Sequence, residues 1–154
     1  MVRRAEARDI PALMGLLDQV NLVHHLGRPD LFRRATKYSP AQLEALLGDP
    51  TMEIFVFEGE GGTVLGHAFC QLTEVSGHKL LCDVKTLYID DICVDEAARG
   101  RHVGKALYEF VCDYARSIGC HNITLNVWEG NDAAFCFYKS MGMQVQKTGM
   151  EMIL

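Results

Sequence analysis

The chain has 154 residues, 49% of them hydrophobic and 23% charged, which is typical of a globular protein with one folded core. No run approaches the roughly 18 consecutive apolar residues of a membrane helix, and the charged N-terminus lacks a secretory segment, so we expect a cytoplasmic protein without membrane contact. The net charge of −5 comes without any Lys/Arg-rich run, which excludes a nucleic-acid groove. Since no repeat or linker interrupts the chain, we expect one domain over residues 1–154.

The first third of the chain predicts a short strand followed by two helices. Residues 2–5 favour the strand, and Asp9 caps a helix that has Pro11 in its first turn. The apolar stripe of this helix consists of Ile10, Leu13, Met14 and Leu17. Ser39, followed by a proline, begins a second short helix, whereas the segment 21–37 between the two helices has no readable pattern.

The middle of the chain has the pattern of strands. Residues 54–57 and 64–72 flank a glycine-rich turn at 58–62, which predicts a hairpin. A further strand over 87–94 leads into a turn at 97–104, and a helix opens from that turn.

The last third predicts a helix, a strand, a second helix and closing strands. The first helix, over 103–118, has apolar residues along one face and charged residues along the other. A strand over 122–128 alternates apolar and polar residues, and a final helix over 131–142 follows it. We expect closing strands at Val145 and over 150–154. This order predicts an α/β domain on a mixed sheet, not a strictly alternating, doubly wound one.

The cysteines and histidines do not suggest a metal or a disulfide framework. The six cysteines are scattered without a C-x-x-C pair, and we interpret them as reduced core thiols because five lie in apolar runs. The adjacent pairs His24-His25 and Cys120-His121 lack the spacing of zinc ligands, so we expect no metal site.

The strand, turn and helix over 87–107 carry the clearest signal for an anion site. Glycines stand at 100 and 104, and amide groups at the start of a helix have no partner within the helix, so they bind phosphate. Arg99 and Arg101 add charged donors. A P-loop and a dinucleotide fingerprint both fail on spacing, which leaves a dedicated anion loop or a turn that only starts a helix.

One further interpretation of this loop is a family resemblance. The pattern Arg99-x-x-His102-x-Gly104 resembles the R/Q-x-x-G-x-G/A motif of the GNAT superfamily of N-acetyltransferases, in which this loop binds the pyrophosphate of CoA. The opening stretch 4–9, the Asp-Ile-Cys-Val strand and the closing segment 131–142 recur in that family in the same order. His102 departs from the pattern, because the family usually has glycine there.

The resemblance implies a fold, a co-substrate and a binding loop. The implied fold is the GNAT fold, a mixed, mostly antiparallel sheet of six to seven strands flanked by about four helices. The implied co-substrate is acetyl-CoA, and no metal is implied. The pyrophosphate loop would consist of Arg99, Gly100, Arg101, His102, Val103, Gly104 and Lys105. The main chain of a bulged strand would bind pantetheine and the acetyl oxygen through Ile92, Cys93 and Val94.

Two residues of the final helix are candidates for contact with CoA. Asn131 and Tyr138 lie seven positions apart, so they share one helix face. In the resembled family the matching asparagine contacts CoA, and the matching tyrosine protonates the CoA thiolate. A helix cap for Asn131 and a core position for Tyr138 are the structural alternatives.

The candidates for the general base are less defined. Asp90 and Asp91 are the nearest carboxylates, and neighbouring strand residues normally point to opposite faces, so at most one is expected to face the substrate. The acidic pair resembles the Glu-Asp of diamine acetyltransferases, which helps hold a cationic amine. Direct base, cation-orienting carboxylate and water relay all remain open. Asn126 stands where some family members have glutamate, and Trp128 on the same face either flanks an ammonium or packs.

These features lead to one preferred function. We expect an acetyl-CoA-dependent N-acetyltransferase that acetylates a primary amine of a small molecule by direct attack in a ternary complex. The alternatives are a protein N-terminal or lysine acetyltransferase, and a non-catalytic acyl-CoA-binding sensor. The expected partner is the small-molecule amine, without nucleic acid or membrane, and a homodimer is left open.

Overall fold

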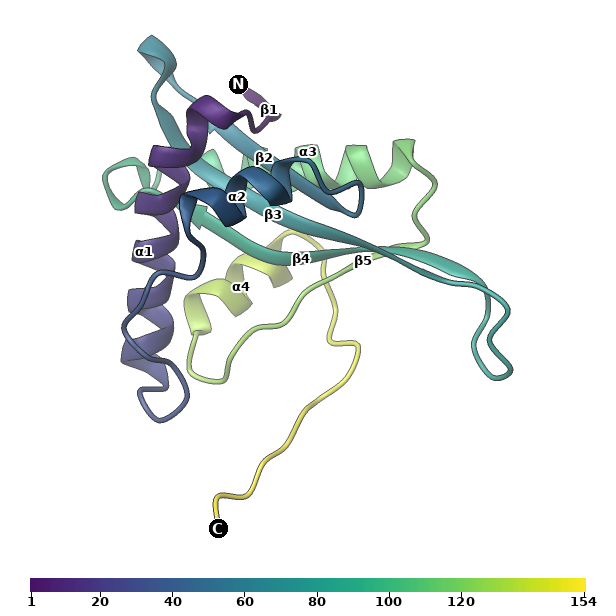
Figure 1. Cartoon of the computed structure of the whole chain (residues 1–154). Helices are drawn as coiled ribbons and strands as arrows, with labels where there is room; N and C mark the ends of the chain where they lie inside the picture. Colours follow the sequence, from purple (N-terminus) through teal and green to yellow (C-terminus); the bar gives the residue numbers. More distant parts are fainter.

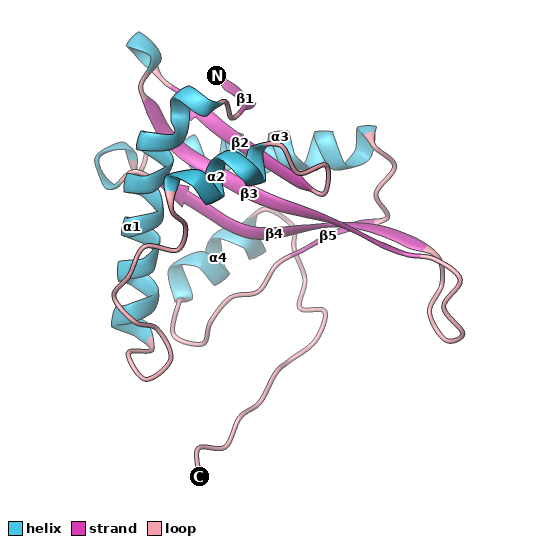
Figure 2. Ribbon diagram, viewed as in Figure 1, coloured by secondary structure: helices cyan, strands magenta, loops and turns pink.

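A five-stranded sheet lies at the centre of the computed structural model, which describes residues 1–154 (Figures 1 and 2). The strands follow one another across the sheet in chain order: β1 (Val2–Arg4), β2 (Met52–Glu58), β3 (Val64–Val75), β4 (Val84–Val94) and β5 (Asn122–Thr124). The first three pairs are antiparallel and β4 pairs with β5 in parallel. The prediction of a mixed, mostly antiparallel sheet is confirmed.

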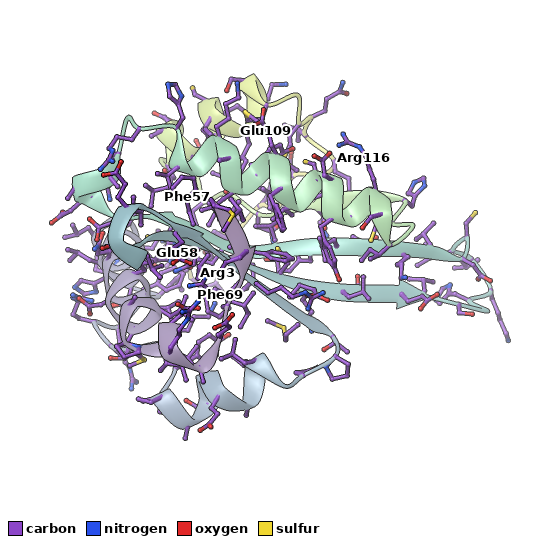
Figure 3. The ribbon with its side chains drawn as sticks, turned by 90° about the horizontal axis from the view of Figure 1, so that it is seen from above. Arg3, Phe57, Glu58, Phe69, Glu109 and Arg116 are labelled. Carbon is purple, nitrogen blue, oxygen red and sulfur yellow. The ribbon has the colours of Figure 1, made fainter.

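Four α-helices cover the two faces of the sheet, as expected. They are α1 (Ile10–Gly27), α2 (Pro40–Leu47), α3 (Val103–Ser117) and α4 (Asp132–Ser140). Three short 3-10 turns, which the sequence analysis missed, complete the elements: Ala7–Asp9, Glu60–Gly62 and Glu96–Ala98. Helices α1 and α2 lie on one face, and α3 and α4 lie on the other (Figure 3). Residues 21–27, which have no readable pattern, continue α1 for its last two turns.

Alternating residues of the central strands build a separate core on each face. On β3, Ala68 and Cys70 belong to the cluster packed against α3, whereas Phe69 between them belongs to the cluster packed against α1 and α2. Figure 3 shows Phe69 on the α1 and α2 side. The outer face of α3 carries Glu109 and Arg116, so this helix is amphipathic, as its sequence pattern predicts (Figure 3).

One glycine allows α3 to approach the sheet closely. A Cβ on Gly66 of β3 would lie 2.7 Å from the main-chain oxygen of Cys93 and 3.1 Å from side-chain atoms of Leu107 and Val103. No side chain fits there without displacing the helix or β4. The contact fixes the start of α3 directly against the end of β4.

The prediction of six to seven strands is wrong, because the closing strands do not form. Residues 144–154 donate no backbone hydrogen bond to any strand, and Val145 and Met150 are 59% and 95% exposed. The segment runs away from the sheet (Figure 1), and an ion pair between Arg28 and Glu151 ties its end to the C-terminus of α1. The apolar residues at 150–154 have strand propensity, but a strand also needs a paired neighbour. The strand expected over 122–128 is shortened to its first three residues.

The cysteines are all free thiols, but they do not all lie in the core. Cys70 and Cys93 are buried, and burial raises the pKa of the Cys93 thiol to about 12. Cys82 and Cys136 are exposed, which corrects the prediction of core thiols for the whole set.

No group of three or more His, Cys, Asp or Glu side chains is arranged to hold a metal ion. None of the helices has both the length and the apolar character needed to cross a membrane.

Replacing Gly66 tests the close packing of α3. We expect Gly66→Ala to destabilise the protein by about 1–3 kcal/mol, because the new methyl group overpacks the contact between β4 and α3. Gly15→Ala is the matched control: Gly15 lies inside α1 with no atom near its missing Cβ, so alanine should stabilise by up to about 1 kcal/mol. Urea unfolding measures both. A Gly66→Ala variant as stable as the wild type contradicts the packing argument.

Candidate active site

A cleft of about 640 Å³ opens where β4 and the chain after β5 separate. Its walls come from four regions far apart in the sequence: α1, the segment 32–37, β4 with the following turn, and the segment from residue 125 into α4. Most of the predicted site residues line it, namely Asp90, Asp91, Ile92, Cys93, Val94, Arg99, Asn126, Trp128, Asn131 and Tyr138. The structure therefore brings together residues that the sequence analysis selected from separate motifs.

The cleft exists because β4 is longer than its neighbour. β5 pairs with β4 only over Thr86–Tyr88, and β4 then continues to Val94 with no strand on that side. Past Thr124 the chain turns away from β4 and forms the opposite wall of the cleft. The outer edge of β4 past Tyr88 therefore has main-chain groups available to a ligand.

A bulge in β4 places two carboxylates on one side. Phe69 of β3 pairs with Asp91, and the next residue, Cys70, pairs with Ile89, so Asp90 is an extra residue without a partner. Strict alternation predicts that Asp90 and Asp91 point to opposite faces. With the bulge, both line the cleft, which corrects the expectation that at most one does.

The two carboxylates have different partners. Lys37 Nζ lies 2.5 Å from Asp90 Oδ2, and this pair is partly exposed. Burial lowers the pKa of Lys37, but the hydrogen bond to Asp90 and the negative charges of Asp90, Tyr38 and Asp91 together outweigh it, so the net shift is upward and the ammonium is favoured. Asp90 is therefore held by a cation from the segment before α2.

Asp91 is held instead by a buried histidine that the sequence analysis missed. His67 on β3 is fully buried, and its Nε2 lies 2.8 Å from Asp91 Oδ2. The other ring nitrogen, Nδ1, has no partner. A proton on Nδ1 would be buried without an acceptor, so the geometry favours a neutral ring that donates from Nε2 to the carboxylate. A signal was present, since His67 is a polar residue at an inward position of an apolar strand.

Tyr138 on α4 is half-buried at the side of the cleft. Its ring packs against those of Phe137 and Tyr108, with centroid distances of 5.1 and 6.1 Å. Burial, followed by the negative charge of Asp91, raises the pKa of the Tyr138 hydroxyl far above its usual value. The hydroxyl is therefore protonated at neutral pH and serves as a donor.

Asn131 begins α4 and also faces the cleft. Its Oδ1 accepts a hydrogen bond of 3.3 Å from the amide of Ala134, so it caps the helix. The cap leaves its amide nitrogen without a protein acceptor. The structural role and contact with a ligand in the cleft are therefore compatible.

The predicted anion loop has a backbone suited to binding phosphate. Gly100 and His102 adopt left-handed conformations, with φ of 76° and 61°, and His102 is the one non-glycine residue with positive φ. This conformation explains why related loops have glycine there, although histidine tolerates it better than most residues. The amides of residues 102–105 have no acceptor in the protein. An added Cβ on Gly104 would contact Val94 at 3.4 Å.

Asn126 and Trp128 lie in the irregular segment after β5, not on a strand. Asn126 Nδ2 donates a hydrogen bond of 3.3 Å to the hydroxyl of Tyr88. Trp128 packs edge-on against Phe32 at 5.3 Å, and the guanidinium of Arg28 lies 5.9 Å from its ring centre. Trp128 therefore lies at the mouth of the cleft beside the segment after α1.

The chemistry of this cleft can be described from its parts. It offers an open strand edge for an extended polar chain, a carboxylate held by a neutral histidine, and a protonated phenol. The loop residues 100–105 do not line it, but they follow its Arg99 directly in the chain and lead into a helix start suited to a phosphate. These groups suit a reaction in which a nucleophile loses a proton and a leaving group gains one.

Comparisons with known proteins agree with this geometry. The model of the acetyltransferase (GNAT) family matches residues 20–143, which contain all of the predicted site residues. A crystal structure of a point mutant of the BH1408 protein from Bacillus halodurans has a TM-score of 0.96 and 30% identity, covering 100% of this chain and 99% of that one. An aminoglycoside N-acetyltransferase in complex with CoA has a TM-score of 0.75 at 15% identity, covering 100% and 98% of the two chains, which shows the fold alone.

A curated relative is similar over a shorter segment. The glucosamine 6-phosphate N-acetyltransferase of Arabidopsis thaliana is 36% identical over 59 residues. The matched segment covers 38% of this chain and 38% of that relative, well under half the length of each.

Proposed function

The chain belongs to the GNAT family of acetyltransferases, and we propose that it transfers the acetyl group of acetyl-CoA to a primary amine of a small molecule. One observation carries the proposal: the open edge of β4, Arg99 of the anion loop and Tyr138 line a single cleft. Phosphate at the start of α3 and pantetheine along β4 would bring the thioester between Asp91 and Tyr138.

The residues divide into those that bind CoA and those that act on the acetyl transfer. The free amides of residues 102–105, with Arg99 and Arg101, bind the pyrophosphate. The edge of β4 over Ile92–Val94 binds the pantetheine and donates to the carbonyl oxygen, where negative charge develops. Asn131 adds a contact to CoA from the start of α4.

The reaction is a direct attack within a ternary complex. The amine loses a proton toward Asp91, directly or through a water, and its nitrogen forms a bond to the thioester carbon. The C–S bond then breaks, and the departing thiolate receives the proton of the Tyr138 hydroxyl. The second proton of the acylated nitrogen leaves through water and restores the phenol. Asp91 is assigned this role over Asp90 because Lys37 already neutralises Asp90.

His67 is a positioning residue in this scheme. Its bond to Oδ2 fixes the orientation of Asp91, and Oδ1 has no partner and is available to the amine. A neutral donor orients the carboxylate without adding a positive charge near the ammonium.

Calorimetry with acetyl-CoA, ATP and NAD tests the function as a whole. We expect binding of acetyl-CoA alone. Gly104→Val should weaken it about tenfold, because a branched side chain at the start of α3 keeps the phosphates from the amides. Gly15→Val, the same change in a helix far from the loop, should leave the affinity unchanged. Specific binding of ATP without acetyl-CoA binding would contradict the proposal.

Tyr138→Phe tests the acid. Loss of the hydroxyl should lower kcat about a hundredfold with KM for acetyl-CoA nearly unchanged, since the proton is transferred only in the transition state. Tyr108→Phe, which removes a hydroxyl from the neighbouring ring on α3, should leave kcat unchanged. Steady-state kinetics with an accepted amine measures both. Wild-type kcat in the Tyr138→Phe variant would show that Tyr138 only packs and is not the acid.

Substitution of His67 tests the positioning role. His67→Leu removes the donor to Asp91 and should lower kcat/KM for the amine about tenfold or more, with KM for acetyl-CoA unchanged. His67→Gln has an amide nitrogen near the place of Nε2 and should recover most of the activity. If both variants lose only stability, and the folded protein keeps its kcat/KM, His67 is structural.

A further inference from the structure

We infer that the acceptor is a monoamine with an apolar, aromatic body, and neither a phosphorylated sugar nor a polyamine. This inference depends on the acetyltransferase function proposed above. It concerns the end of the cleft that is formed by the C-terminal part of α1, the segment 32–37 and Trp128.

The acidic groups of the cleft suit one ammonium. Asp90 and Asp91 are the only carboxylates among the lining residues. Asp90 is paired with Lys37 at 2.5 Å, so its charge is already balanced. Asp91 receives a neutral donor from His67 and retains an oxygen without a partner. A second or third ammonium, as in a polyamine, would have no free carboxylate to meet.

Apolar and aromatic residues make up much of this end of the cleft, beside the polar Asn21, His24 and Thr36. Val20 and Val23 line it from α1, and Phe32 and Trp128 line it from the segments after α1 and β5. Phe32 and Trp128 pack edge-on at 5.3 Å, with the His24 ring 5.0 Å from Phe32 and the Arg28 guanidinium 5.9 Å from the Trp128 ring, so a bound ring would extend an existing aromatic cluster. Val23 and Trp128 remain 47% and 43% exposed, and a bound apolar group would remove this surface from water.

No Lys or Arg that lines this end of the cleft is free to receive a phosphate. Lys37 and Arg99 are the only Lys or Arg residues that line the cleft. Lys37 is paired with Asp90, and Arg99 belongs to the anion loop after β4. Arg28 lies beside Trp128, but its guanidinium donates to both oxygens of Asp30 and to Glu151.

A phosphate group in this position would therefore lie near the two carboxylates and would have no cation to pair with. Glucosamine 6-phosphate, the acceptor in the name of the Arabidopsis thaliana relative, has a phosphate group that requires a free cation. The similarity to that relative covers only 59 residues and does not determine the acceptor.

An amine panel tests the inference. Release of the CoA thiol gives kcat/KM for 2-phenylethylamine, ethylamine, spermidine and glucosamine 6-phosphate. We expect 2-phenylethylamine to exceed each of the others at least tenfold. An equal or higher value for spermidine or glucosamine 6-phosphate overturns the inference and leaves the acetyltransferase function standing. Binding of acetyl-CoA without acetylation of 2-phenylethylamine also overturns it, whereas absence of acetyl-CoA binding removes the function and the inference together.

A variant of the aromatic wall separates recognition of the body from recognition of the amine. Trp128→Ala should raise KM for 2-phenylethylamine about tenfold and leave KM for ethylamine within twofold. Phe135→Ala is the matched control, because Phe135 is a similarly exposed aromatic residue, 45% exposed, that lies outside this cleft. It should change neither value. Equal effects of Trp128→Ala on both amines would show that the ring does not contact the body and would overturn the assignment of this wall.

Discussion

The site depends on one extra residue in β4. Asp90 has no partner in β3, and a strand bends and twists more strongly at such a bulge. Past this point β4 continues to Val94 while β5 has already turned away. A regular strand would extend the parallel ladder and close the space in which the cleft lies. The open strand edge and the two carboxylates on one side are therefore consequences of the same irregularity.

The bulge also brings two negative charges close together, and the surrounding residues give each of them a different partner. Two neighbouring carboxylates in a confined cleft repel each other unless each has a donor. Asp90 receives a cation from Lys37, and Asp91 receives a neutral donor from His67. One negative charge is thereby balanced and one remains. The same charge lies close enough to Tyr138 to help keep its hydroxyl protonated, so a carboxylate and a protonated phenol lie in one cleft.

The parts of the site that depend on local sequence were predictable. The anion loop follows from the order of arginines and glycines before a helix, and the cap at Asn131 from its place before an apolar helix. The same holds for the four helices and for the strands β1 to β4, whose apolar patterns are clear. At residues 150–154 this reasoning failed, because an apolar run favours a strand only where a neighbour is available to pair.

The parts that depend on pairing between distant segments were not predictable. A bulge at Asp90 leaves no mark in β4 itself, since it is a difference in register from β3. The partnership of His67 with Asp91 spans 24 positions and appears only once that register is known. The end of β5 at Thr124 is likewise set by the point at which the chain leaves β4. The alternation of apolar and polar residues continues beyond that point, so the sequence does not mark the end of the strand.

The two ends of the cleft are built on supports of different rigidity. At the proposed CoA end, Gly66 brings α3 against the sheet, and the loop follows β4 through a single 3-10 turn, so packed elements fix its position. At the proposed acceptor end, the wall comes from the end of α1 and the segment 32–37, which is held by side-chain contacts such as Arg34 with Asp18. This wall belongs to neither β4 nor α3, and Lys37 is the residue of the segment that pairs with β4. Acceptor preference can therefore diverge among related proteins while the CoA site stays the same, which is why similarity in the family motifs identifies the reaction but not the amine.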